Sequence, residues 1–87
     1  MKIKNGFVVR SVGGEYVVVP VGELSKSFRG MINLNETGAF LWRFFSEERT
    51  KEEAVNALKN EYDADEGTLS ADVDKFMEIL IRNGFAE

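Results

Sequence analysis

The side chains of this chain that could do chemistry are mostly carboxylates. Three of them, Asp63, Asp65 and Asp74, fall at positions 1, 3 and 12 of a notional calcium-binding loop. Such a loop needs Gly at position 6 and a bidentate Glu at position 12, whereas this chain has Thr68 and Asp74 there. The better interpretation is an acidic turn between two helices, and we predict no metal site.

The composition removes the commonest catalytic and metal-binding groups. The chain has no Cys, which excludes disulfides and thiolate metal sites, and no His, the usual general base and metal ligand. Its glycines match neither a phosphate-binding loop nor a dinucleotide-binding fingerprint. A general acid needs a buried site, but the carboxylates lie on helix faces expected to be solvated. We therefore expect no catalytic residue, no cofactor and no enzymatic activity.

Size and charge narrow the classes of protein further. The 87 residues are 44% hydrophobic and 30% charged, which predicts one globular domain over residues 1–87. The net charge of −4 repels nucleic acid and does not favour an anionic membrane. The apolar run Phe7–Val9 ends at Arg10, too short for a signal peptide, and no segment could span a membrane. We expect a cytoplasmic protein.

Valine-rich runs in the first third of the chain predict β-structure. The runs Phe7–Val12 and Tyr16–Val21 are separated by Gly13-Gly14, which suits the positive φ angles of a tight antiparallel hairpin. Pro20 has no N–H and should lie at a strand end or an edge. A short third strand is predicted from Met31 to Leu34, with side chains alternating between its two faces.

Three helix-period segments follow, each with a local start signal. Asn35 is placed to cap a helix over Glu36–Phe45. Thr50–Glu53 is a capping box that opens a second helix, and either Asp65 or Thr68 could cap the third. The order β-β-β-α-α-α predicts an α+β, winged-helix-like fold, in which a three-stranded antiparallel sheet precedes a three-helix bundle.

The third predicted helix, which ends near Asn83, has a wider apolar face than a core helix needs. The face spans roughly 200°, compared with about 100° for an ordinary core stripe. Ile79 lies off one flank and Ile81 off the other. Deep burial of the longest helix in a small domain would account for this width, and so would a flank that lines a groove.

Strands combined with three helices also describe a winged-helix DNA-binding or regulatory domain, which is the alternative function. A recognition helix should present Arg, Lys, Asn or Gln to the major groove. The third helix balances Lys75 and Arg82 with three carboxylates, so no clustered positive surface is evident. We therefore expect no nucleic acid partner.

Several short motifs occur in a fixed order along most of the chain. The strongest is Leu34-Asn-Glu-Thr-Gly-Ala-Phe-Leu-Trp42, followed by Thr50-x-x-Glu-Ala54 and Leu58-x-x-x-Tyr62, and then by Asp72-Val-x-x-Phe76 and Gly84-Phe85. In order and spacing the chain resembles the PqqD family, the recognition elements of pathways that modify ribosomally made peptides. Gly38 stands where that family often has Ala.

The resemblance implies a non-catalytic domain that binds the leader of a precursor peptide and presents it to a modifying enzyme, often a radical SAM enzyme. It also implies that the leader adds as a strand beside the third strand and lies against the third helix. The backbone of three residues would then supply the strand edge: Met31, Ile32 and Asn33. Side chains of the third helix would form the wall: Lys75, Ile79 and Arg82, with Phe76 at the base.

The resemblance leaves two points open. The loop Gly22–Arg29 lacks the proline-containing stretch of members that serve pyrroloquinoline quinone synthesis, so the pathway could concern that cofactor or another modified peptide. Trp42 could belong to the core or face a partner.

Overall fold

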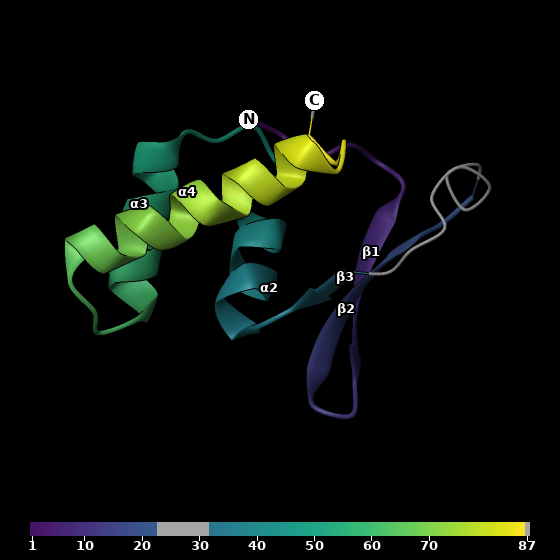
Figure 1. Ribbon diagram of the computed structural model, residues 1–87, viewed down its shortest axis with the longest axis horizontal. Coiled ribbons are helices and arrows are strands. Elements are labelled where there is room, and N and C mark those ends of the chain that lie inside the picture. Colours follow the sequence, from purple (N-terminus) through teal and green to yellow (C-terminus); the bar gives the residue numbers. More distant parts are fainter. Residues whose placement is uncertain (23–31, 87) are drawn as a thin grey trace.

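The computed structural model describes residues 1–22 and 32–86. Within them the chain forms three strands, β1 (Phe7–Val12), β2 (Glu15–Pro20) and β3 (Ile32–Leu34). Three helices follow, α2 (Glu36–Phe44), α3 (Lys51–Glu61) and α4 (Glu66–Arg82) (Figure 1). The predicted α+β fold with the order β-β-β-α-α-α is confirmed.

Two sequence-based predictions fall outside the described residues. Met31 was expected to begin the third strand, and the described part of β3 begins at Ile32. The loop Gly22–Arg29 is described only at Gly22. What was predicted for the other residues of that loop and for Met31 therefore stays a prediction.

The sheet is antiparallel with the strand order β1-β2-β3, which makes β3 an edge strand. Gly13 and Gly14 turn the chain between β1 and β2 with φ angles of 58° and 84°. Positive φ at both central residues is what a two-residue type I′ hairpin requires. Val12 pairs with Glu15 across this turn, and Pro20 lies at the end of β2, as predicted.

Each helix begins at a capping residue. The Asn35 side chain accepts the Gly38 N–H at 2.7 Å at the start of α2. Of the two candidates for the α4 cap, the structure uses Asp65, whose Oδ2 accepts the Thr68 N–H at 3.0 Å. Phe45, predicted as the last residue of α2, is its C-cap instead.

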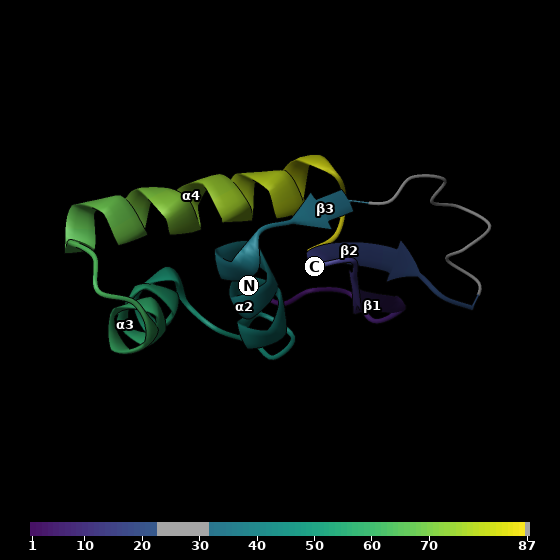
Figure 2. The same ribbon diagram turned by 90° about the horizontal axis from the view of Figure 1, so that it is seen from below.

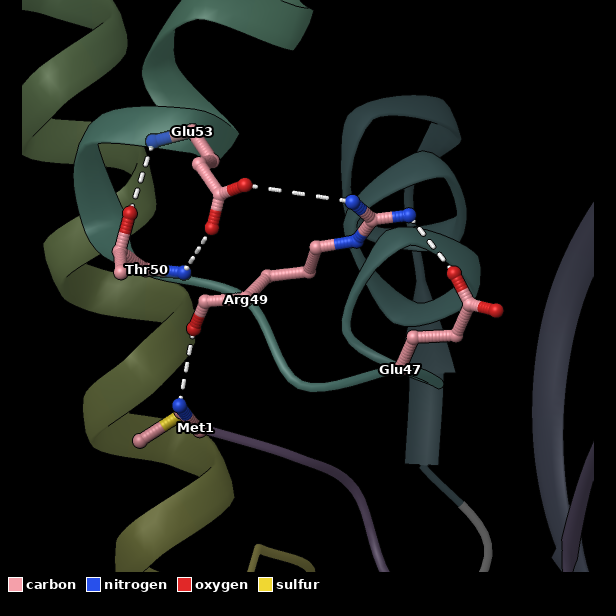
Figure 3. Close-up of polar contacts among 5 residues, drawn as sticks. All are labelled: Met1, Glu47, Arg49, Thr50 and Glu53. Carbon is pink, nitrogen blue, oxygen red and sulfur yellow. Dashed lines mark hydrogen bonds and ion pairs between the residues drawn. The ribbon is translucent and has the colours of Figure 1, made fainter.

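The start of α3 is held by the predicted capping box (Figure 3). Thr50 Oγ1 accepts the Glu53 N–H at 3.2 Å, and Glu53 Oε1 accepts the Thr50 N–H at 2.9 Å. Arg49, just before the box, pairs with Glu47 at 2.7 Å and with Glu53 at 3.9 Å. The Met1 ammonium donates to the Arg49 carbonyl oxygen at 2.8 Å. The first residues are thereby tied to the α2–α3 connection.

Trp42 belongs to the core, which settles the point that the sequence left open. It is 4% exposed, and its ring meets Phe7 and Phe85 edge-on at centroid distances of 6.0 and 5.5 Å. The core also contains four fully buried aliphatic residues of the helices: Leu41, Leu58, Val73 and Leu80. Leu34 and Phe44 are half-buried and pack against the same core.

Helix α4 is the longest element and runs alongside both α2 and α3, with the sheet beyond its C-terminal half (Figures 1 and 2). It ends in a Schellman motif, in which Phe85 N–H donates to Leu80 O at 2.8 Å and Gly84 N–H to Ile81 O at 3.2 Å. Gly84 has a φ of 73°, which glycine adopts without a Cβ clash. Neither α4 nor any other described helix is long and apolar enough to cross a membrane.

Candidate functional site

A pocket of about 270 Å³ lies between β3 and α4, with α2 beneath it. Its lining includes Asn33 from β3 and three residues of α4, Lys75, Phe76 and Ile79. All four were among the site residues predicted from the sequence, although they come from segments about 40 positions apart. The structure therefore brings these four residues together around one groove.

The alternation of hydrogen-bonded and non-bonded residue pairs in the sheet determines which backbone groups of β3 face this groove. Val21 N–H donates to Gly6 O at 2.8 Å, which continues the bonded pairs that the hairpin turn starts at Val12 and Glu15. Bonded and non-bonded pairs alternate along an antiparallel ladder. The odd-numbered residues of β2 therefore direct their amides and carbonyls to β1, and the even-numbered residues direct theirs to β3.

The same alternation determines the direction in which the amide and carbonyl groups of β3 point. Ile32 is opposite Val18 and Leu34 is opposite Tyr16, so the amide and carbonyl groups of Ile32 and Leu34 point to β2. The N–H and C=O of Asn33 point the other way, to an edge that no described strand covers. Of the two described residues predicted to offer edge backbone, Asn33 presents it, whereas Ile32 turns its own toward β2.

The α4 residues predicted as a wall differ in their surroundings. Phe76 is only 5% exposed and forms the apolar base, while Ile79 is 40% exposed at the rim. Lys75 is exposed and forms no ion pair within the described part of the chain. Arg82 lies almost one turn beyond Ile79, where its guanidinium pairs with Glu78.

Sequence reasoning missed the part of the lining that comes from the β3–α2 junction. Leu34, Gly38 and Leu41 lie under the groove, and Asp72 lies on its α4 rim. Gly38 is buried, and a Cβ there would lie 3.3 Å from the Leu34 Cβ and 3.2 Å from Asn35 Oδ1. The available signal was a glycine at the start of a helix, four positions after Leu34 and three positions before Leu41.

The carboxylates considered as a calcium site have other partners. The Asp65 carboxylate accepts the Thr68 hydroxyl at 2.7 Å as well as the Thr68 amide, and these bonds lower its pKa. Asp74 pairs with Lys51 at 2.9 Å. Among the described residues, no group of three or more His, Cys, Asp or Glu could hold a metal ion.

The chain matches one protein family and is similar to two solved structures. The family model described as Coenzyme PQQ synthesis protein D (PqqD) matches residues 15–86. The structure of TbiB1 in complex with the TbiA(beta) leader peptide is similar, with 25% identity and a TM-score of 0.77; the match covers 100% of this chain and 95% of that one.

A lasso peptide synthetase B1 complexed with the leader peptide has 17% identity and a TM-score of 0.75, and the match covers 99% of this chain and 95% of that one. At that identity the likeness concerns the fold. No curated protein matches the sequence significantly.

Proposed function

Because this chain belongs to the PqqD family, we propose that it binds the leader of a ribosomally made precursor peptide and presents it to a modifying enzyme. The observation that carries the proposal is the open edge of β3 beside the groove of α4. The similar TbiB1 structure contains a leader peptide, which supports the same kind of ligand here.

The edge and the groove suit the two needs of strand addition. The unpaired backbone groups of an edge strand supply main-chain bonds, and side-chain pockets beside it supply selectivity. We propose Met31, Ile32 and Asn33 as the edge segment, with Asn33 providing the described backbone groups. Lys75, Phe76 and Ile79 would form the wall, and Arg82 would extend it beyond the described pocket.

The chain would act without catalysis of its own, as a single domain in the cytoplasm, where ribosomes make precursor peptides. Its partner enzyme would be a radical SAM or other modifying enzyme, in pyrroloquinoline quinone synthesis or in another peptide pathway. The absence of His and Cys from the whole sequence supports a non-catalytic role. Turnover of a precursor peptide by the purified chain alone would overturn that part of the proposal.

The DNA-binding alternative finds no support. The net charge is −4, and the groove rim carries Asp72 next to Lys75 rather than a cluster of cations. Titration with random duplex DNA at low salt should show no salt-sensitive micromolar binding. Such binding would bring the alternative back.

The test uses a matched pair of isoleucines on α4. The probe is a synthetic peptide that covers the leader of a short precursor gene found next to the gene of this chain. Ile79→Ala should weaken peptide binding by about 1–2 kcal/mol, roughly tenfold, because Ile79 offers a partly exposed apolar contact in the groove. Ile81→Ala should leave binding unchanged, because Ile81 is 65% exposed and lies outside the pocket lining.

Amide chemical-shift mapping with the same peptide shows where it binds. Shifts are expected at Asn33, Gly38 and Phe76. If they cluster instead on the β1–β2 hairpin or on α3, and Ile79→Ala binds normally, the proposed groove is wrong.

A further inference from the structure

We propose that the modifying enzyme docks on the face of α2 that does not line the peptide groove. This inference rests on the proposed function, because presenting a bound peptide to an enzyme requires a second interface that leaves the groove open. It assigns to the enzyme a projecting apolar side chain with a carboxylate next to it.

Helix α2 lies between α3 and the β1–β2 hairpin, and it lines two separate surfaces (Figures 1 and 2). On one side, Thr37, Gly38 and Leu41 line the peptide groove. On another side is a hollow of about 320 Å³, here called the α2 hollow, which is lined by Phe40, Arg43, Phe44, Glu47 and Arg49. No residue lines both, so a partner seated in the α2 hollow leaves the groove open.

The floor of the α2 hollow is aromatic and only half-buried. The rings of Phe40 and Phe44 stack at a centroid distance of 6.4 Å, and Tyr62 meets Phe40 edge-on at 6.2 Å. By contrast Trp42 and Phe45, which turn toward the core, are 4% and 0% exposed. The core therefore does not take up all the aromatic surface of α2. Aromatic residues beside Arg are enriched in the centres of protein interfaces.

Two guanidinium groups flank this floor. Arg49 lies 4.8 Å from the centroid of the Phe44 ring and pairs with Glu47 at 2.7 Å (Figure 3). Arg43 is exposed, lies 5.9 Å from the centroid of the Tyr16 ring, and forms no ion pair within the described residues. The lining thus carries two positive groups and one negative group, although the net charge of the chain is −4.

The chemistry of the α2 hollow indicates the partner surface that it fits. An apolar side chain placed over Phe40 and Phe44 would replace water favourably. A carboxylate next to it would complement the unpaired charge of Arg43, whose planar guanidinium can bind both carboxylate oxygens. The attraction between these two charges grows as the docked partner excludes water.

The experiment titrates the full chain with the purified peptide-modifying enzyme whose gene adjoins its own, with and without the leader peptide. Arg43→Glu reverses the unpaired charge and should weaken enzyme binding about tenfold or more. Arg10→Glu is the matched control, because Arg10 is also exposed but lies on β1, outside the linings of the α2 hollow and the groove. It should leave the enzyme affinity unchanged, and both variants should bind the leader peptide normally.

A second variant tests the aromatic floor. Phe44→Leu removes the ring that stacks on Phe40 and lies under Arg49, and it should weaken enzyme binding a few-fold while peptide binding is retained. Circular dichroism checks that this variant is folded. If it is not, Arg43→Glu decides the point, because that change is at an exposed side chain.

The outcomes separate this inference from the proposed function. If the peptide binds in its groove and Arg43→Glu leaves the enzyme affinity unchanged, the docking surface alone is wrong. It is also wrong if Arg10→Glu causes an equal loss, or if the enzyme binds neither with nor without peptide. Self-association of the chain that Arg43→Glu abolishes in sedimentation would assign the α2 hollow to a second copy instead. If the enzyme binds through Arg43 but no leader binds the chain, the docking surface is upheld and the proposed peptide binding fails.

Discussion

Helix α4 faces α3 along one side and β3 along another, and these two sides are built differently. The contact with α3 is called the closed side here because ion pairs join the two helices, between Lys51 and Asp74 at 2.9 Å and between Lys59 and Glu66 at 3.9 Å. A hollow lined mostly by polar residues, Asn56 and Ser70 among them, lies on the surface between these helices. Beneath these pairs, the apolar side chains of the two helices are buried: Val55, Leu58, Leu69 and Val73. Toward β3 the contact is a groove, where Ile79 is 40% exposed.

From this difference we propose that one helix serves both stability and binding. The α3 side buries its apolar surface within the chain, so it stabilises the fold and offers little apolar surface to a partner. The β3 side keeps apolar surface and unpaired rim charges, Asp72 and Lys75, which are free of ion pairs within the described residues. Substitutions on the α3 side should therefore change the free energy of unfolding. Substitutions on the β3 side should change the affinity for peptide.

The largest expected effect is on the closed side. Leu58→Ala removes a side chain that is 0% exposed and should lower the free energy of unfolding by about 2–4 kcal/mol, measured by urea denaturation. Ile79→Ala is the matched change on the open side and should cost less than about 1 kcal/mol, since its side chain already contacts water. Equal costs for the two variants would break the comparison.

The next effect concerns the start of α3. Thr50→Ala removes the hydroxyl that accepts the Glu53 amide and should lower the free energy of unfolding by about 1 kcal/mol. Thr50→Ser keeps a hydroxyl and serves as the control, with most of the stability retained. Peptide affinity measured by calorimetry should not change in either variant; a change would mean that the closed side takes part in binding.

Substitutions of two lysines test the difference between the two sides of α4 through their charge. Lys75→Gln should weaken an acidic peptide a few-fold at low salt, with the loss fading as salt is added, because a rim charge acts through screened attraction. Lys59→Gln changes a lysine that already pairs with Glu66 and should leave the affinity unchanged. A salt-independent loss with Lys75→Gln, or an equal loss with both variants, contradicts the assignment of Lys75 to the groove.

The smallest effect is a pH dependence at the α4 cap. Hydrogen bonds from the hydroxyl and amide of Thr68 lower the pKa of Asp65 below its ordinary value. The carboxylate therefore stabilises the fold above its unfolded pKa, and this contribution is lost as pH falls toward the folded pKa. Denaturation midpoints at acid pH should fall less steeply for Asp65→Asn, which can still cap the helix. Identical slopes would show that Asp65 contributes nothing to acid unfolding.

Local features of the fold were predictable because they depend on neighbouring residues. The Asn35 cap, the Thr50 capping box and the Gly13-Gly14 turn each lie within a few positions, and all three are confirmed. The predicted end of α2 was one residue too long because Phe45 continues the apolar period of the helix while serving as its C-cap.

Features that join distant segments were harder to predict. The burial of Trp42 depends on Phe7 and Phe85, which lie 35 and 43 positions away from it in the sequence. The positions of Gly38 and Leu41 under the groove depend on how closely α2 approaches β3 and α4, and a glycine at a helix start does not by itself specify that approach. The α4 residues of the groove could be named because the resemblance to the PqqD family implies them, and the wide apolar arc of the helix pointed to Ile79 in particular.

The buried position of Trp42 also gives the protein an optical probe. It is the one tryptophan of the chain, and it lies between Phe7 and Phe85 rather than in the lining of the groove. Its fluorescence should shift to longer wavelength when the core opens to water, and it should barely respond when a tryptophan-free peptide binds. Because every urea titration can use this emission and every binding titration can use a dye on the peptide, folding and recognition can be measured independently in one cuvette.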